Sequence, residues 1–357
     1  MLLTRRSARL ACVLFFLTGI GLAGTAAAQD TVEISNAQEL QGMNEDLDGD
    51  YRLADDIDAS NLDFEPIGDF QNRFTGTFDG DGHTVSGLTV EPPEGRPPRD
   101  FVGLFGAVGR NGTVEDVGVE GARVVGFQDV GGIAGVNSGE IRRSYFDGEV
   151  LGDTAVGGLV GTNSGELAES YATVRIGATG NDGGGLVGSN TGNVTEAYAA
   201  ATVALEDASL GGAVGFNGAY TDRVYWDTGV SGVPASERVT GLTTDEMTGE
   251  AARDSMEFNF NGTWRTTQGY PALVWQSEDA VVELPEGETG DGGTDDGNGD
   301  GSEDGGGGDD GGDTDGTEDS PEEREGEGEG EEGMPGFGGL VAVLALFFGS
   351  LLNRHRR

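Results

Sequence analysis

Small-residue blocks recur through the middle of the chain at a nearly constant step, and this repeat limits the fold more than any other feature. Each block has the form Gly-x-x-Gly, and the steps between successive first glycines are 29, 26, 27 and 27 residues. The first glycines are Gly103, Gly132, Gly158, Gly185 and Gly212. Self-similarity at this period is typical of stacked units, each of which buries its apolar face only against its neighbours.

Three further columns keep the same phase as the glycines. Asparagines follow the second glycine of four blocks by two residues, tyrosines come eight residues later, and aliphatic β-branched residues follow after five more. The members are Asn137, Asn163, Asn190 and Asn217; Tyr145, Tyr171, Tyr198 and Tyr225; and Val150, Ile176, Val203 and Val230. We predict that each column stacks from one coil to the next.

Repeat length and composition favour an all-β fold, a parallel β-helix (solenoid) of about 27-residue coils with terminal caps. A propeller blade needs about 40–45 residues, and leucine-rich repeats need a frame that the chain lacks. Helical repeats need runs of good helix formers, which glycine and β-branched residues interrupt here. At about 3.3 Å per residue, each unit provides roughly three short strands with their turns.

Each column has an expected role in such a coil. Glycine lets the chain bend at corners and lets adjacent walls approach closely. Leu159 and Val160, on one strand, should point to opposite sides. The asparagines fall in turns where this residue tolerates the left-handed conformation, and their stacked amides can form a hydrogen-bonded ladder. The tyrosines should form a second ladder at the wall, with an exposed sugar-binding strip as the alternative.

The blocks "GGLVG" and "GGIAG", each followed by asparagine, resemble the GLUG motif of secreted proteins, which is also found in bacterial IgA peptidases. The resemblance extends to "FTGTFDGDGHTVSGLTV" before the repeats and to "GLTTDEMTG" and "TWRTTQGYPALVWQ" after them, about 250 residues in all. It implies a secreted repeat fold. We expect an N-terminal cap and opening coils over residues 29–98, repeats over 99–232 and a C-terminal cap over 233–280.

Both ends of a solenoid need caps that hide open strand edges. Ser35 and Gln38 have capping-box spacing before a predicted N-terminal cap helix, and Thr243 and Glu246 have the same spacing after the repeats. Three large aromatic residues follow, with enough area to plug the far end of the solenoid. They are Trp264, Tyr270 and Trp275.

Residues 1–28 are predicted to be a secretory signal peptide. They have a basic start, the apolar run Leu10–Gly24 and a small-residue cleavage site at Ala26–Ala28. The only cysteine is Cys12, so the mature chain would have none, which excludes disulfides and thiolate metal sites. The pair Arg5-Arg6 leaves twin-arginine export open beside the general secretory route.

The C-terminal end carries a second predicted targeting signal. Residues 281–333 are predicted to be an acidic, Gly-rich disordered linker, since 286–333 hold 21 acids and 18 glycines against one arginine. Residues 334–357 contain Pro335, Gly336 and Phe337, then an apolar stretch to Leu352 and a basic tail. This order resembles the PGF-CTERM archaeal sorting signal. It implies cleavage by an archaeosortase and attachment to a membrane lipid anchor, with a C-terminal transmembrane helix as the alternative.

The charge of the chain is strongly negative. It carries 64 acidic residues against 20 basic ones, all of them arginine, and residues 29–285 alone have 43 acids and 13 arginines. Like-charge repulsion disfavours nucleic acid and anionic lipid as partners. Molar salt screens such repulsion by shrinking the Debye length to about 3 Å. The lysine-free, acid-rich composition resembles that of extremely halophilic archaeal proteins.

The residues give little support to catalysis, and we assign no catalytic, cofactor-binding or metal site. A zinc peptidase needs His-Glu-x-x-His, whereas His83 is the only histidine outside the basic tail. A β-helix that cleaves polysaccharides would use carboxylates, which an acidified surface offers at every spacing. The candidates are Asp79, Asp81, Asp129, Asp147, Asp153 and Asp182.

Two weaker kinds of site stay open. The aspartates of 46–50 and 79–81 leave a structural cation such as calcium open, although a turn between strands explains them better. Sequons at Asn111, Asn193 and Asn261 predict N-glycosylation sites of an exported protein.

These features together predict an exported, envelope-anchored β-helix with a structural or adhesive role at the cell surface. The expected partners are the export machinery, an archaeosortase, a membrane lipid anchor and a glycan or other cell-surface partner, but no nucleic acid. The alternatives are a polysaccharide-acting lyase or glycosidase, and a passive component of the envelope that has no specific ligand.

Overall fold

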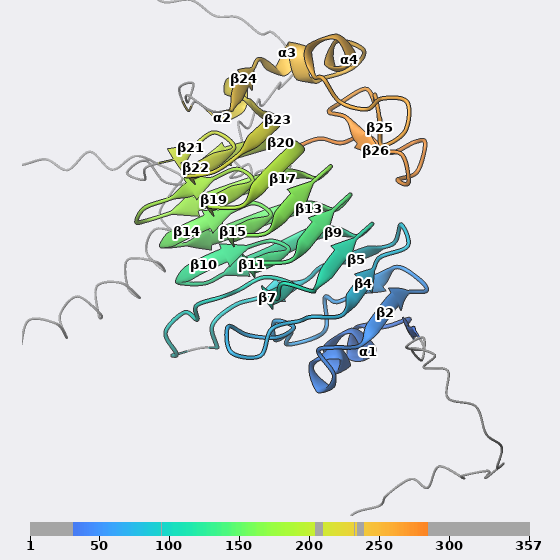
Figure 1. Ribbon diagram of the computed structural model, residues 1–357, viewed down its shortest axis with the longest axis vertical. Helices are drawn as coiled ribbons and strands as arrows, with labels where there is room; N and C mark the ends of the chain where they lie inside the picture. The colour runs from blue at the N-terminus through green and yellow to red at the C-terminus, as the bar shows by residue number, and fades with distance from the viewer. Residues whose placement is uncertain (1–30, 94, 204–209, 232, 234–238, 285–357) are drawn as a thin grey trace, which may run out of the picture.

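The computed structural model describes residues 31–93, 95–203, 210–231, 233 and 239–284. The predicted signal peptide, the acidic linker beyond residue 284 and the sorting segment lie outside the described residues. Within them the chain forms a parallel β-helix, which confirms the predicted fold class (Figure 1).

Each central coil has four short strands, not the three predicted, because the corners take up few residues. The coil that begins at residue 128 contains β10 (Gln128–Gly131), β11 (Ala134–Asn137), β12 (Glu140–Arg142) and β13 (Tyr145–Gly152). Only two residues separate most of these strands, so the chain turns sharply and the next coil starts at residue 154.

The strands stack into three parallel sheets. A five-stranded sheet contains β7 (Phe105–Val108), β11, β15 (Val160–Asn163), β19 (Val187–Asn190) and β22 (Val214–Asn217). A four-stranded sheet contains β10, β14 (Thr154–Gly157), β18 (Gly183–Gly184) and β21 (Leu210–Gly211). These two sheets form adjoining walls of the coil (Figure 1).

The third sheet has 15 strands and covers the two remaining walls. One wall contains β1 (Val32–Ile34), β2 (Asp50–Leu53), β4 (Thr77–Asp79), β8 (Thr113–Glu115), β12 and β16 (Glu166–Ala168). The other contains β3 (Ile57–Asp58), β5 (Thr84–Ser86), β6 (Thr89–Val90), β9 (Gly118–Val125), β13 and β17 (Tyr171–Ala178). The walls count as one sheet because β20 (Asn193–Val203) runs unbroken around their corner and pairs with both β16 and β17. The last strands are β23 (Thr221–Asp227) and β24 (Thr240–Leu242).

Strand register preserves the repeat of the sequence. Tyr145 lies opposite Tyr171, and Tyr171 lies opposite Tyr198. The aliphatic column behaves in the same way for its first three members, which pair from β13 to β17 to β20. The column ends there, because Val230 belongs to the short helix α2 (Thr228–Ser231) that closes the last coil.

The core is a continuous apolar column inside the coils. Leu159 and Val160 are both fully buried, so the prediction that they point to opposite sides is wrong. The reason is that Leu159 lies at the corner between β14 and β15, where its side chain turns inward. Its equivalents Ile133 and Leu186 are buried at the same corner.

The block glycines are required by close backbone packing. A Cβ atom on Gly161 would lie 2.5 Å from the carbonyl carbon of Asp129, in the wall formed by β10. A Cβ on Gly158 would collide with the carbonyl oxygen of Gly185 in the next coil. Neither glycine has a positive φ, so close approach of the walls is what excludes a side chain.

The N-terminal cap is the helix α1 (Ala37–Gly42), followed by the 3-10 turn η1 (Met43–Glu45). Its capping differs from the predicted Ser35–Gln38 pair. The side chain of Asn36 accepts the Glu39 amide at 3.0 Å, and the Glu39 carboxylate accepts the Ser35 amide at 2.8 Å. The capping pair is therefore shifted by one residue.

The C-terminal region starts with α3 (Thr244–Met247), where the predicted Thr243–Glu246 capping box is confirmed. After α4 (Ala251–Ser255) come β25 (Trp264–Arg265) and β26 (Ala272–Leu273), which form an antiparallel pair. Residues 256–284, here called the strap, run back along the side of the solenoid (Figure 1). The prediction that its aromatic residues plug the far end is wrong, because Trp264 and Trp275 pack against tyrosines of the side wall.

Replacing Gly161 with alanine tests the glycine argument. Because the added methyl group meets rigid backbone, Gly161→Ala should lower the free energy of unfolding by about 3 kcal/mol. Chemical denaturation at molar salt measures this change. Gly42→Ala is the matched control, since no atom lies within 4 Å of its added methyl group and alanine should stabilise α1 by up to about 1 kcal/mol. Equal effects of the two substitutions would contradict the close-packing explanation.

Candidate functional site

The four asparagines form a continuous side-chain ladder inside the solenoid. Asn137 donates its amide to the Asn163 Oδ1 at 2.9 Å, Asn163 donates to Asn190 at 2.9 Å, and Asn190 donates to Asn217 at 3.0 Å. The first three residues are completely buried. None of the four has a positive φ, so the expectation of a left-handed turn conformation is wrong. Each asparagine is instead the last residue of its strand.

The tyrosines form a second ladder on the outer side of the wall that contains β13, β17 and β20. The rings of Tyr145 and Tyr171 stack with centroids 4.9 Å apart, and those of Tyr171 and Tyr198 with centroids 5.0 Å apart. The interplanar angles are 4° and 1°, as expected when one rotamer repeats in register. Tyr225 instead meets Phe258 edge-on.

The strap covers this tyrosine ladder. Trp275 stacks on Tyr145 with centroids 5.5 Å apart, and the Trp264 ring lies 5.7 Å from that of Tyr198. Tyr198 donates its hydroxyl to the Pro271 carbonyl at 2.6 Å. All four tyrosines are buried, and burial is the main cause that raises the pKa of each. The alternative of an exposed sugar-binding strip is therefore wrong.

A column of charged residues in the left-handed conformation occupies one corner of the coils. Its members repeat in phase with φ between 46° and 53°, and sequence reasoning missed them because they are not glycine or asparagine. They are Asp116, Arg143, Glu169, Glu196 and Arg223. The amides of Arg143 and Glu169 each bond to a carbonyl of the next coil, so the conformation preserves inter-coil pairing. In the sequence these charged residues recur at the same step as the other columns, and this recurrence could have identified them.

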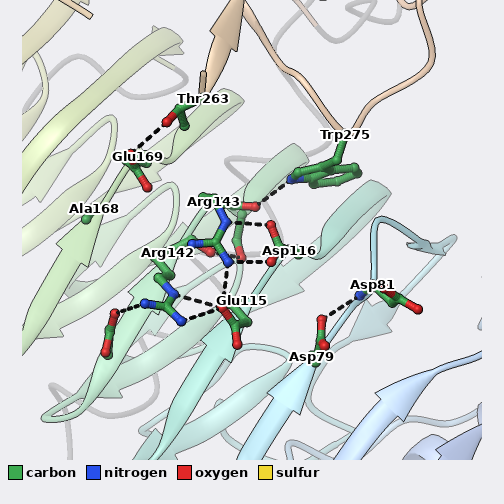
Figure 2. A network of polar contacts seen from close by, with 12 residues as sticks. Asp79, Asp81, Glu115, Asp116, Arg142, Arg143, Ala168, Glu169, Thr263 and Trp275 are labelled. Carbon is green, nitrogen blue, oxygen red and sulfur yellow. Dashed lines mark hydrogen bonds and ion pairs between the residues drawn. The ribbon is translucent and has the colours of Figure 1, made fainter. Parts of the chain in front are cut away.

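Figure 2 shows that this corner is also an ion-pair network. Arg142 and Arg143 both contact the Glu115 carboxylate, at 2.7 and 2.6 Å, and Arg143 also binds Asp116 at 2.7 Å. These acids raise the pKa of Arg143, most strongly through the hydrogen bond that Arg143 donates to Asp116. The strap joins the network through Trp275, whose Nε1 donates to the Arg143 carbonyl at 3.0 Å. The pairs therefore bind coils and strap together.

The candidate carboxylates do not converge on one site. Asp129, Asp147 and Asp153 lie on different walls or corners, and each accepts a threonine hydroxyl of the following coil. Asp182 lies at the corner before β18, with a φ of 64°. Most of these groups therefore act as rungs between coils and do not form a catalytic pair.

The calcium-like turns are also held by internal contacts. Asp79 accepts the Asp81 amide at 2.8 Å, and Arg52 lies 3.8 Å from both carboxylates. In the other turn, Asp46 accepts the Asp48 amide at 3.3 Å. Among the described residues, no group of three or more His, Cys, Asp or Glu could hold a metal ion. His83 pairs with Asp56 at 3.2 Å.

The structure describes the predicted glycosylation residues but not the predicted sorting motif. Asn111, Asn193 and Asn261 are all exposed. Pro335, Gly336 and Phe337 lie outside the described residues. In the part of the chain that the structure describes, no helix is long and apolar enough to cross a membrane.

Two open grooves remain as candidate binding sites. One of about 600 Å³ lies between the tyrosine wall and the end of the strap, and its lining includes Glu120 and Asp147. Burial, and secondarily the charge of Glu120, raises the pKa of Asp147. The other groove, of about 1310 Å³, lies beside the N-terminal cap.

Comparison with known proteins finds surface-type sequences and a matching fold. Halomucin of Haloquadratum walsbyi is 36% identical over 142 residues, which is 36% of this chain and 2% of that protein. A protein of Evansella cellulosilytica described as a candidate Gly-rich membrane protein is 33% identical over 108 residues, 28% of this chain and 12% of that one. The chain thus spans a small part of the length of these relatives. No protein-family model matches it.

A solved structure from Bacteroides ovatus, described as a candidate immunoglobulin A1 protease, has the same fold. It superposes with a TM-score of 0.53 at 18% identity and covers 71% of this chain and 94% of that one. At this identity the likeness concerns the fold alone.

Removing one rung tests the asparagine ladder. Asn163→Ala should lower the free energy of unfolding by about 2–4 kcal/mol, because it leaves buried polar groups of Asn137 and Asn190 without their partner. Equilibrium denaturation at molar salt gives the value. Asn217→Ala, at the half-buried end of the ladder, is the matched control and should cost less. A smaller loss for Asn163→Ala than for the control would refute the buried-ladder argument.

The half-buried carboxylate of Asp129 predicts a specific pH dependence of stability. Burial mainly raises its pKa, and Asp100 adds to this against the hydrogen bond from Thr162. A raised folded-state pKa means that the folded chain binds the proton more tightly. Stability is therefore lost as pH rises from the ordinary value of 3.8 through the raised value.

Asp129→Asn should remove this loss, so the stability of the wild type relative to the variant should fall as pH rises through that window. Exposed Asp58 is the control, because hydrogen bonds from Ser60 lower its pKa and Asp58→Asn should give the opposite trend. Denaturation curves at several pH values measure both. Parallel pH profiles for wild type and Asp129→Asn would contradict the burial argument.

Proposed function

We propose that this chain is an exported, envelope-anchored β-helix with a structural or adhesive role at the cell surface. The proposal rests on one observation: the repeated polar side chains bind neighbouring coils to one another. The asparagines, threonine-bound aspartates and corner ion pairs join one coil to the next, and the tyrosines hold the strap. Such a chain is a rigid shaft that can present a binding surface away from the envelope.

The acid-rich surface and the relatives support this setting. The match to Halomucin covers 142 residues, and the Evansella relative is described as a membrane protein. Halomucin and a Gly-rich membrane protein as relatives support the proposal of an exported protein in a salt-adapted cell. Molar salt would screen the repulsion between the many carboxylates of such a shaft.

Anchoring is proposed from the sequence of the C-terminal end. The PGF-CTERM-like segment at Pro335–Phe337 would be cut by an archaeosortase, and the new C-terminus would be joined to a membrane lipid. The acidic linker would then hold the solenoid away from the membrane. N-glycans on Asn111, Asn193 and Asn261 would add neutral polar groups to exposed positions.

The mature surface protein should lack the basic tail. Mass spectrometry of the C-terminal peptide, recovered from intact cells, should find no peptide that ends at Arg357. An intact Arg357 on the surface-localised protein would instead indicate the transmembrane-helix alternative.

Deletion of the gene should reduce attachment of the cells to one another or to a polysaccharide surface, and the wild-type gene should restore it. Attachment assays at molar salt measure the effect. Unchanged attachment would instead support the passive envelope component without a specific ligand.

One observation favours the second candidate, a polysaccharide-acting enzyme. Glu120 and Asp147 line the same groove of about 600 Å³, and the raised pKa of Asp147 is a property that a general acid requires. Release of reducing ends or unsaturated sugars by the purified chain, abolished by Asp147→Asn, would establish this activity. Binding without turnover would support the adhesive role.

A further inference from the structure

The groove of about 1310 Å³ beside the N-terminal cap lies outside the repeat columns. One side is formed by α1 and η1, and the other by residues 63–75 together with 99–101. Pockets for compact small ligands are usually about 300–1,000 Å³. An open groove of this size suits an extended chain better than a compact molecule.

Reciprocal hydrogen bonds fix the two sides of the groove relative to each other. Gln41 donates its side-chain amide to the Glu65 carbonyl at 2.9 Å and accepts the Glu65 amide at 2.8 Å. Asn44 accepts the Gly68 amide at 2.8 Å in the same manner. A groove held in this way needs little ordering when it binds, which preserves affinity.

Neutral amide groups are concentrated in this groove. Three of the seven glutamines of the chain line it, together with Asn44 and Asn72. The side chains of Gln38 and Gln71 are exposed and have no hydrogen-bond partner within the described residues. An amide both donates and accepts, as does a sugar hydroxyl, so these two groups can bind a hydroxyl-rich ligand without a net charge.

An aromatic patch adjoins the amides. Phe70 is 49% exposed and stacks on Phe101 with centroids 4.8 Å apart, and the Arg73 guanidinium lies 4.6 Å from the Phe70 ring. Phe101 has a φ of 61°, although the equivalent positions in the next coils hold Asp129 and Ala155. A phenylalanine in this conformation costs about 1 kcal/mol. Stacking on Phe70 offsets part of this cost.

The charge of the groove limits the chemical classes of ligand that it can bind. Six carboxylates and only two guanidinium groups line it, which disfavours uronate or sulfate groups. The carboxylates do not converge as metal ligands do, since no group of three or more forms among the described residues. We propose that this groove binds neutral, hydroxyl-rich glycan chains through the Phe70–Phe101 stack and the amides of Gln38 and Gln71. The inference rests on the adhesive function proposed above and names its ligand class.

Binding of the full-length chain to immobilised neutral oligosaccharides at molar salt tests this inference. Phe70→Ala should weaken binding about tenfold, because it removes the exposed ring that stacks on the lining residue Phe101. The matched control is Phe216→Ala, since Phe216 is 51% exposed on the terminal strand β22 and should leave affinity unchanged. An equal loss for both variants would overturn the assignment.

The double variant Gln38→Ala/Gln71→Ala separates binding from folding. Both side chains are exposed and without partners, so the thermal unfolding of this variant should match the wild type whereas its affinity should fall. Neutral-glycan binding that survives both Phe70→Ala and the double variant would overturn the site and leave the adhesive function standing. Tighter binding to uronate chains would overturn the ligand class. Attachment that persists after gene deletion would contradict the adhesive function itself.

Discussion

The fold depends on close stacking of coils at a nearly constant step. Backbone pairing across β13, β17 and β20 repeats residue for residue, and the block glycines let adjoining walls touch without side chains between them. Because the central coils are bonded to one another at the same positions, side chains that repeat in their sequence also repeat in space. The asparagine and tyrosine ladders, and the charged corner, are consequences of this one constraint.

The strap completes what the coils leave open. A stack of tyrosine rings on an outer wall would expose a long apolar strip, which soluble proteins rarely tolerate. Residues 256–284 cover the strip with aromatic rings and add polar contacts to Arg143, Glu169 and Asp227. Capping along the side stabilises several coils at once, whereas a plug at the far end would stabilise only the last one.

The groove that we propose as the glycan site lies outside the repeat columns. The polar groups of the columns are hydrogen-bonded to neighbouring coils. Abundant carboxylates such as Asp129 and Asp153 therefore form no common site. The two grooves lie where the regular coil meets other structure, one beside the strap and the other beside α1. The N-terminal groove combines exposed amides, an adjoining aromatic stack and a lining in which carboxylates outnumber guanidinium groups.

The sequence alone determined the parallel β-helix, its step and the columns that stack, because a short in-phase repeat of glycine and β-branched residues permits few other architectures. It also specified the Thr243–Glu246 capping box, since capping depends only on local spacing. Only the tertiary structure decided the four-strand coil, the inward turn of Leu159, the charged left-handed corner and the lateral strap. Each of these depends on which backbones approach one another, and a contact such as Trp275 with Tyr145 joins residues 130 apart in the chain. Local spacing carries no information about such a contact, because burial of apolar area is decided only when the whole solenoid has formed.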